Sequence, residues 1–417
     1  MEQRTSPVNS GKGTSGLQFQ KMLKEETRRA EMSDFIRTFA GRRTNEMIGR
    51  MMMLLFLLIP LLALAYVGWH VWLLLPLSWG WRTVILLLMV GAFMLLFASI
   101  FRATDRLPMP LATAVYEVGT SSIIVLLYLF MLFVVLDLGR LLHLRPAAWL
   151  RDNWWTAGCI VLFLFSLFVY GNRHYRHKYR QEITIRSTKV TKPVKLVLMS
   201  DLHLGYHNRR KEFARWVDLI NNEQPDMILV AGDIIDGSMR PLREERMHEE
   251  FQRLEAPVFA CLGNHEYFSG EPEAQRFYGD AGIHLLRDAS AIQGDLCILG
   301  RDDRMNRRRQ PLRDLAKSAD KSKYLVLLDH QPYHLEQAER EGVDFQFSGH
   351  THHGQVWPIS WITDMMYECA FGTYQRGSTN YYVSSGMGIW GGKFRIGTRS
   401  EYLVLTIDPL QQGQAGG

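Results

Sequence analysis

Cysteine is scarce in this chain of 417 residues, and its four cysteines are scattered along the sequence: Cys159, Cys261, Cys297 and Cys369. No two of them form a C-x-x-C pair, which excludes a thiolate zinc site of that kind and leaves no disulfide framework. Cys159 lies in an apolar run, where a free thiol packs as a small hydrophobic residue. The cysteine content therefore favours a reducing compartment.

The N-terminal region lacks a phosphate-binding loop and a cleavable signal. Residues 11–15 contain glycine and lysine but have neither P-loop spacing nor a preceding strand. The first apolar run begins near residue 51 and has no small-residue cleavage site, which argues against a signal peptide. Residues 1–45 are polar and rich in Gly, Ser, Lys, Arg and Glu, so we predict a disordered cytoplasmic segment there.

Long apolar runs are abundant only before residue 172. Four of them cover residues 51–72, 83–101, 115–136 and 154–170. Each is long enough for a helix that crosses about 30 Å of hydrocarbon. Tryptophan and tyrosine residues near their ends are typical of an interfacial aromatic belt. We therefore predict an all-α four-helix transmembrane bundle over residues 46–172.

Basic residues near the spans predict their orientation. With the N-terminus inside, nine basic residues flank the inner ends: Arg42, Arg43, Arg50, Arg102, Arg106, Arg173, Arg176, Lys178 and Arg180. The outer loops carry four: Arg82, Arg140, Arg145 and Arg151. The positive-inside rule then places both termini, and everything after the fourth span, in the cytoplasm. Two acids, Glu117 and Asp137, lie in or beside the third span, and structural and functional roles both stay open for them.

The stretch after the fourth span is basic and aromatic. Residues 173–190 are predicted to form a juxtamembrane linker, either a simple stop-transfer flank or a collar against anionic headgroups. The alternating part of this stretch, residues 181–190, has the pattern of an edge strand. Residues 191–410 have the composition of a soluble α/β domain, and residues 411–417 are predicted to be a flexible tail.

Five short polar blocks in residues 191–410 each follow an apolar run with strand character. They contain Asp201 and His203, Gly232 and Asp233, Gly263 to Glu266, Asp329 and His330, and Gly349 to His353. Such tips at the carboxyl ends of strands carry functional groups in α/β folds. The mixture of carboxylate, amide and imidazole groups suits Mn, Fe or Zn better than a site for Ca or Mg alone.

These blocks, in this order, resemble the calcineurin-like metallophosphoesterase family, and the details around them are similar to its membrane-linked bacterial subgroup. The resemblance implies two packed β-sheets flanked by helices, and two divalent metal ions of uncertain identity. It implies that Asp233 bridges the two ions. The other implied ligands are Asp201, His203 and His352 for one ion, and Asn264, His330 and His350 for the other. His265 resembles the family's catalytic histidine, which is not a ligand.

Other polar residues have less certain roles. In the basic loop 301–309, Arg304 and Arg307 are candidates for binding a substrate phosphate, although a solvated loop explains them as well. Asp329 either orients His330 or merely ends its strand. His353 either lies outside the ligand set, facing solvent or supporting a ligand, or is a further ligand, and we favour the first interpretation. His207, His248, His284 and His334 match no block and are predicted to be ordinary surface or helix residues.

The sequence predicts a metal-dependent phosphoesterase in a bacterial inner membrane, with its hydrolase domain in the cytoplasm. We expect metal-activated hydroxide to cleave a phosphodiester or pyrophosphate of a lipid-linked or membrane-proximal substrate. The alternatives are a phosphomonoesterase for a protein or small molecule, and a membrane sensor or scaffold. The expected partners are the phospholipid bilayer and this phosphorylated substrate. Nucleic acid is not expected, and the sequence leaves the oligomeric state open.

Overall fold

The computed structural model describes residues 58–144 and 147–410. The chain divides into two compact units, Met1–Tyr66 and Val67–Gly417. The predictions for residues 1–45, for the start of the first span and for the 411–417 tail lie outside the described residues. We call residues 58–176 the helical half and residues 178–410 the two-sheet half.

Within the described residues, three helices are long and apolar enough to cross a membrane: α2 (Trp79–Ile100), α3 (Met109–Leu141) and α4 (Trp154–Arg176). A further apolar helix, Leu58–Leu74, is shorter. Its predicted beginning near residue 51 lies outside the described part, so the structure supports three spans and leaves the four-helix bundle untested. The short 3-10 helices η1 (Ala103–Arg106) and η2 (Ala147–Leu150) lie between the longer ones.

Glycine allows α2 and α3 to pack closely. A Cβ atom on Gly119 of α3 would lie 2.5 Å from the carbonyl carbon of Leu95 in α2, so only glycine fits there. Of the two acids in α3, Glu117 is exposed, while Asp137 lies 3.0 Å from Nε2 of His70. Asp137 therefore contacts a side chain of an earlier apolar helix, which gives it a structural role.

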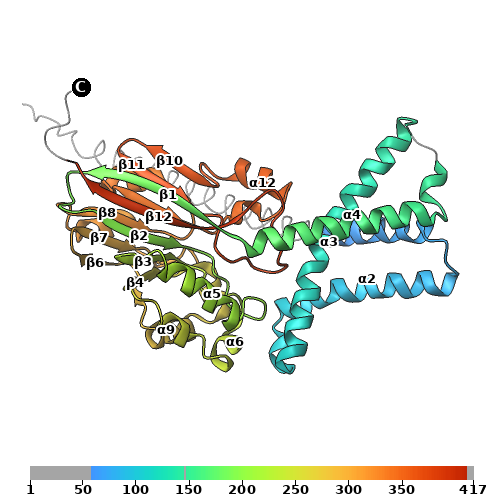
Figure 1. The fold of residues 1–417 in the computed structure, drawn as a ribbon, viewed down its shortest axis with the longest axis horizontal. Helices are drawn as coiled ribbons and strands as arrows, with labels where there is room; N and C mark the ends of the chain where they lie inside the picture. The colour runs from blue at the N-terminus through green and yellow to red at the C-terminus, as the bar shows by residue number, and fades with distance from the viewer. Residues whose placement is uncertain (1–57, 145–146, 411–417) are drawn as a thin grey trace, which may run out of the picture. The chain divides into compact units, whose positions relative to one another are not determined.

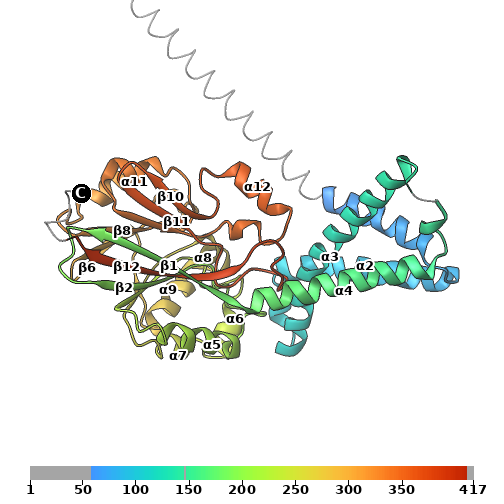
Figure 2. The same cartoon turned by 45° about the horizontal axis from the view of Figure 1, so that its top comes forward.

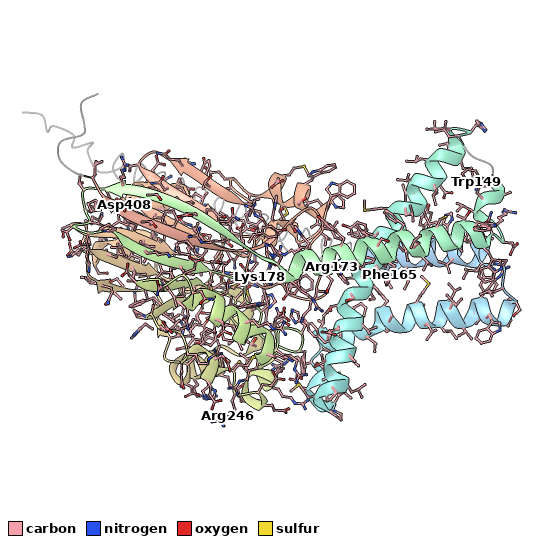
Figure 3. All side chains as sticks on the ribbon, viewed as in Figure 1. Trp149, Phe165, Arg173, Lys178, Arg246 and Asp408 are labelled. Atoms are coloured by element: carbon pink, nitrogen blue, oxygen red, sulfur yellow. The ribbon has the colours of Figure 1, made fainter. Side chains whose placement is uncertain are left out.

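The connection between the halves differs from the predicted linker. The helix α4 continues through Arg176, and its last turn carries basic residues that interact favourably with the helix dipole. Strand β1 (Lys178–Ser187) then begins at once, as the labelled Arg173 and Lys178 in Figure 3 show. β1 is the edge strand of a sheet and pairs in parallel with β12 (Ser400–Pro409). Residues 178–187 are thus part of the sheet rather than a tether.

Two six-stranded sheets form the second half, as predicted for an α/β metallophosphoesterase fold (Figure 1). The first has the order β1-β12-β2-β3-β4-β5, with β2 (Val194–Met199), β3 (Met227–Ala231), β4 (Val258–Cys261) and β5 (His284–Leu285). The second has the order β10-β11-β9-β8-β7-β6. Its strands are β6 (Ala289–Gln293), β7 (Leu296–Gly300), β8 (Tyr324–Leu328), β9 (Phe345–Ser348), β10 (Gly372–Arg376) and β11 (Thr379–Val383).

The main core lies between the two sheets, where Leu198 of β2, Leu229 of β3 and Val326 of β8 are fully buried. Separate clusters pack helices onto the outer faces of both sheets (Figure 2). This half contains the helices α5 (Arg210–Asn221), α6 (Met239–Glu244), α7 (His248–Phe251), α8 (Asn264–Ser269), α9 (Glu271–Asp280), α10 (Leu312–Lys317), α11 (Glu336–Glu341) and α12 (Ile359–Met366), and the 3-10 helix η3 (His352–Gly354). Parallel pairing of β2, β3 and β4, and of β8 and β9, brings their carboxyl ends to one region.

Candidate metal centre

The polar blocks meet because each directly follows one of these parallel strands. Asp201 and His203 follow β2, Asp233 follows β3, and Asn264 follows β4. In the second sheet, His330 follows β8 and His350 follows β9. Backbone hydrogen bonds join neighbouring tips, from Asp201 N to the Gly232 carbonyl (3.1 Å) and from Gly349 N to the His330 carbonyl (3.0 Å). The structure therefore brings the predicted ligand residues together.

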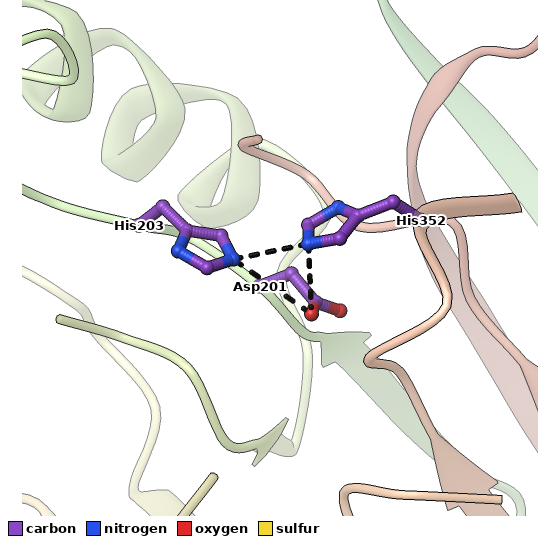
Figure 4. A group of neighbouring side chains, drawn as sticks. All are labelled: Asp201, His203 and His352. Atoms are coloured by element: carbon purple, nitrogen blue, oxygen red, sulfur yellow. Dashed lines mark hydrogen bonds and ion pairs between the residues drawn. The ribbon is translucent and has the colours of Figure 1, made fainter. Parts of the chain in front are cut away.

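One group of donor atoms consists of Asp201, His203 and His352 (Figure 4). Nε2 of His203 lies 3.1 Å from Nε2 of His352, and Oδ1 of Asp201 lies 3.5 Å from the latter atom. Two ligands at about 2.1 Å from one ion stand about 3.4 Å apart in tetrahedral geometry. The spacing of these three atoms is thus suitable for a shared cation. All three side chains are almost completely buried.

A second group contains Asp233, His330 and His350, joined by Asn264. Nε2 of His330 lies 3.1 Å from Oδ2 of Asp233 and 3.1 Å from Oδ1 of Asn264. Nδ1 of His350 lies 2.9 Å from the same amide oxygen. Oδ2 of Asp233 also lies 3.7 Å from Nε2 of His203, so this carboxylate stands between the two groups.

The hydrogen bonds of His330 test whether this centre fits metal ions. Its Nδ1 lies 2.8 Å from the carbonyl oxygen of Ala231 and therefore donates. In the neutral ring Nε2 then carries a lone pair, which faces two oxygen atoms. Such a convergence of lone pairs is stable only around positive charge, either a second proton or a metal ion. The donor set, buried and mixed in nitrogen and oxygen, fits a borderline divalent cation.

Two residues of the second group have the protonation states that metal ligands need. Burial by itself would raise the pKa of the Asp233 carboxyl, but nearby imidazoles, led by His330, hold it well below its usual range. Burial and the neighbouring His330 lower the pKa of His350 to about 3. His350 is therefore neutral at physiological pH, while Asp233 is ionised, which is the protonation state that a metal requires of both.

The backbone at the centre is held in an unusual conformation. Six residues of the blocks have positive φ angles between 45° and 71°: Asp201, His203, Asp233, His350, His352 and His353. Residues other than glycine avoid this left-handed region, and holding them there costs about 1–3 kcal/mol each. Such strain clusters at functional sites, so its concentration here supports a functional role for the blocks.

Two glycines explain why the blocks are glycine-flanked. A Cβ atom on Gly349 would lie 2.2 Å from Oδ2 of Asp201, and one on Gly263 would lie 2.1 Å from Oδ1 of Asp233. The freed space lets backbone amides approach the carboxylates. His350 N donates to Oδ1 of Asp201 (3.0 Å), and His265 N donates to Oδ1 of Asp233 (2.9 Å).

His265, the predicted catalytic histidine, lies beside the first group without belonging to the ligand set predicted for either ion. Its ring meets the His203 ring edge-on, with 4.5 Å between centroids. Its Nδ1 donates to the carbonyl oxygen of Asp236, so the neutral ring carries its lone pair on Nε2. The side chain is about one-fifth exposed, which allows contact with a substrate.

Three supporting residues were given no role in the sequence analysis. Asp236 lies 3.1 Å from Nδ1 of His203 and so fixes the tautomer of that ligand. The buried Glu266 accepts three backbone hydrogen bonds that tie the Asp233 loop to Gly263. The fully buried Arg395 donates to the carbonyl of His352 (2.7 Å). The spacing of Asp236 and Glu266 within their blocks was a usable signal, whereas nothing in the sequence singles out Arg395.

The remaining candidates lie outside the two groups. The Arg304 guanidinium lies 4.2 Å above the Tyr333 ring, which is linked through Tyr367 to the edge of His350. Arg307 is exposed in the same loop. Asp329 pairs with Arg301 and Arg309, while the Ala231 carbonyl orients His330, so the strand-end interpretation of Asp329 holds.

Two histidines outside the ligand set also have defined environments. His353 stacks on Phe371 and lies 3.3 Å from Asp364, in agreement with a role outside the ligand set. His207 was expected at the surface, but it is 98% buried because its ring stacks on Tyr116 of α3. The pattern of a single histidine in a loop gave no sign of this partner, which lies 91 residues earlier in the chain.

Comparison with known proteins gives concordant results. A family model described as calcineurin-like phosphoesterase matches residues 194–354. An uncharacterized metallophosphoesterase of Aquifex aeolicus is 30% identical over 239 residues, which cover 54% of this chain and 90% of that protein. A Helicobacter pylori metallophosphoesterase is 31% identical over 239 residues, covering 56% of this chain and 64% of the relative. A Danio rerio transmembrane protein with metallophosphoesterase domain is 30% identical over 233 residues, covering 51% of this chain and 53% of that protein.

Proposed function

Because this chain belongs to the calcineurin-like metallophosphoesterase family, we propose that it is a membrane-anchored phosphohydrolase with two metal ions. The observation that carries the proposal is the convergence, in two adjoining groups, of donor atoms from seven side chains at five strand ends. Intact carboxylate, amide and imidazole groups at these seven positions argue against a sensor or scaffold that lacks turnover.

Asp201, His203 and His352 would hold one ion, and Asn264, His330 and His350 the other, with Asp233 shared. Two bound divalent cations, such as Mn, Fe or Zn, would neutralise phosphoryl charge and lower the pKa of a water molecule. The Asn264 amide supplies a ligand without adding negative charge. Backbone amides orient both aspartates, so the chain presents the carboxylates in fixed positions.

His265 is proposed to stabilise the phosphoryl group or to protonate the leaving oxygen. Donation from its Nδ1 to the Asp236 carbonyl orients the ring and leaves Nε2 to hold or transfer a proton. Partial exposure separates His265 from the buried ligands and makes it accessible to a leaving group.

We propose a phosphodiester or pyrophosphate of a lipid-linked or membrane-proximal compound as the substrate. Helix α12, shortly after the His352 block, exposes Trp361 (60%) and Met365 (79%). The loop before α12 is hydrogen-bonded to α3, a helix long and apolar enough to cross a membrane, because the Tyr128 hydroxyl donates to the Trp357 carbonyl at 2.6 Å. Large exposed apolar side chains at such a place favour contact with lipid.

A basic and aromatic surface lies at the end of α4. An open cavity of about 540 Å³ is lined there by Phe165, Ser166, Val169, Tyr170, Arg173, His174, His177 and Tyr179. Residues of α4 and β1 form this cavity, and none of the candidate metal ligands lines it. Aromatic and cationic groups together favour anionic headgroups, so this surface supports the proposed position beside a bilayer.

The distribution of arginines supports a cytoplasmic two-sheet half, and we propose a bacterial inner membrane as its location. Arg173 and Arg176 end α4, and Arg102 and Arg106 lie between α2 and α3, at the ends assigned to the inner side. The test is labelling of single cysteines placed at residue 144 and at residue 189 in sealed inverted vesicles. The proposal requires the second to react with an impermeant reagent and the first to be protected.

Activity is tested with the full chain purified in detergent and supplied with Mn²⁺. We expect hydrolysis of bis-p-nitrophenyl phosphate to exceed that of the monoester. Asp233→Asn should reduce turnover by more than about 100-fold. Loss of a residue that only hydrogen-bonds to a metal ligand costs about 10- to 100-fold, and Asp233 is itself a proposed ligand. Asp314→Asn, at an exposed carboxylate paired with Lys317, is the matched control and should retain activity.

Three results would contradict the proposal at different levels. Turnover that survives Asp233→Asn would exclude the two-metal mechanism. Preference for the monoester would favour a phosphomonoesterase. Full-length protein that binds no Mn²⁺ and turns over neither ester would favour the sensor or scaffold.

A further inference from the structure

We infer that helix α3 supplies a positioning residue to the metal centre: the Tyr116 hydroxyl holds Asp236, which in turn orients the ligand His203 and the proposed catalytic His265. This inference rests on the proposed function for its effect on turnover, but its effect on metal binding can be measured independently. It makes the helical half a structural part of the catalytic centre and not only its anchor.

The first link joins the two halves directly. The Tyr116 hydroxyl donates to Oδ2 of Asp236 at 2.6 Å, and both side chains are buried. The same hydroxyl accepts a hydrogen bond from Gly391 N at 3.2 Å. A short hydrogen bond from a neutral donor to a buried carboxylate is charge-assisted, and such bonds are the stronger ones in proteins.

The second link reaches the proposed ligand and the catalytic histidine. The other carboxylate oxygen of Asp236, Oδ1, lies 3.1 Å from Nδ1 of His203 and 3.9 Å from Nδ1 of His265. The Asp236 carbonyl accepts from that same His265 nitrogen. Since Asp236 bonds Tyr116 and His203 through different oxygens, the rotation of its carboxylate is fixed from both sides. The direction of the His203 lone pair depends on that rotation.

The surroundings of Tyr116 hold its hydroxyl in place. Its ring stacks on His207, with centroids 5.0 Å apart and planes inclined by 15°. Nε2 of His207 donates to the Ile389 carbonyl, and burial lowers the pKa of His207 to about 4, so this imidazole is neutral. The Tyr206 ring also belongs to this cluster, with its centroid 6.1 Å from that of Tyr116. The aromatic cluster therefore fixes Tyr116 with uncharged groups.

The contact belongs to a continuous stripe on α3. Residues at intervals of four are buried along the helix: Ala112, Tyr116, Thr120, Ile124 and Tyr128. A Cβ atom on Gly391 would lie 3.3 Å from Thr120, and one on Gly392 would lie 3.0 Å from Ile124. Spacing of four residues marks one face of a helix, so this face backs the glycine-rich loop next to the metal centre.

The experiment compares Tyr116→Phe with the wild-type chain, both full-length and in detergent. Phenylalanine keeps the ring contacts with His207 and Tyr206 and removes only the hydroxyl. We expect the Mn²⁺ affinity of the first site, measured by calorimetry, to fall about 3- to 10-fold. This is less than the 10- to 100-fold typical of a direct partner of a ligand, because Tyr116 is one contact further out. The kcat at subsaturating Mn²⁺ should fall in parallel, with KM for the diester unchanged.

Tyr128→Phe is the matched control, because its hydroxyl also joins α3 to the two-sheet half but reaches only the Trp357 carbonyl. This variant should bind Mn²⁺ like the wild type. The double variant Tyr116→Phe/Asp236→Asn distinguishes a specific effect on Asp236 from a general loss of structure. If Tyr116 acts through Asp236, Tyr116→Phe should have no further effect on Mn²⁺ affinity in the Asp236→Asn background.

Each outcome decides the inference. Wild-type Mn²⁺ affinity in Tyr116→Phe would overturn it, as would an equal loss in Tyr128→Phe or full additivity with Asp236→Asn. A wild-type chain that binds Mn²⁺ but hydrolyses no ester would contradict the proposed function, yet the affinity comparison would still test the link. If the melting curve shows that Tyr116→Phe folds poorly, Tyr206→Phe serves as a second variant. It loses the hydrogen bond to Asp105 but keeps the Tyr116 hydroxyl. It therefore distinguishes damage to the aromatic cluster from loss of the Tyr116–Asp236 hydrogen bond.

Discussion

The two halves of the molecule use the same apolar residues in opposite ways. In α2 only 6% of the most apolar 18-residue stretch is buried within the protein, and the side chains of Leu87 and Leu88 are about two-thirds exposed. In the two-sheet half, every residue of β3, β7 and β8 is buried. The apolar side chains of the first half therefore need a lipid solvent, whereas those of the second build their own core.

Because of this difference, the two halves contribute to function in different ways. The two-sheet half places polar groups at strand ends, where they are buried and held by hydrogen bonds. The described part of the helical half has few polar groups, and Tyr116, which bonds Asp236 beside the candidate ligands, lies near the beginning of α3. The comparison predicts large effects on chemistry from the two-sheet half and effects on membrane integration from the exposed faces of the helices.

The largest effect expected within this comparison is on turnover. His265→Ala should lower kcat by about 10²- to 10⁴-fold, the usual contribution of general acid–base catalysis. Mn²⁺ affinity should stay near the wild-type value, since His265 is not among the proposed ligands. Steady-state kinetics and calorimetry on the same sample separate the two quantities.

His334→Ala is the control for His265→Ala, because the His334 side chain is 57% exposed and lies outside the centre. If His265→Ala keeps turnover within twofold of the wild type, the leaving oxygen does not depend on this imidazole. A large loss of bound Mn²⁺ instead would make His265 a ligand.

A second variant tests the helical half. Leu88 lies near the middle of α2 and is 67% exposed. Leu88→Asp should disfavour membrane integration by about 2.5–3.5 kcal/mol, the cost of a charged residue at the centre of a spanning helix. The measurement is the fraction of chain that stays in carbonate-washed membranes.

Leu88→Ile keeps the apolar character and should integrate like the wild type. Equal integration of Leu88→Asp and Leu88→Ile would mean that protein, rather than lipid, covers this face of α2. That result would remove the contrast between the two halves.

The smallest effect concerns the rim of the centre. Arg304→Gln should raise KM for the diester about 2- to 5-fold, as expected for loss of one exposed cation held over an aromatic ring. kcat should not change, because Arg304 contacts none of the proposed ligands. Arg313→Gln, an exposed arginine of α10, is the control, and an unchanged KM in both variants would remove Arg304 as a substrate contact.

Local patterns predicted much of the two-sheet half. Asp201, Asp233 and His330 each follow a short apolar strand, so their placement required only the rule that parallel strands end together. The same reasoning also predicted the edge strand in residues 181–190, but it treated residues 173–190 as a linker, because only the register with β12, more than 200 residues away, shows that β1 begins at Lys178. It also failed for His207, whose burial depends on the Tyr116 ring.

The sequence by itself indicated which residues are candidates for the chemistry and which segments are apolar enough to cross a membrane, because the motifs and the apolar runs both consist of neighbours along the chain. Tertiary structure alone decided which groups support that chemistry. Tyr116 and Asp236 are 120 residues apart, and Arg395 reaches His352 across 43. A hydrogen bond between such residues depends on how whole elements pack, and no spacing or composition records that packing.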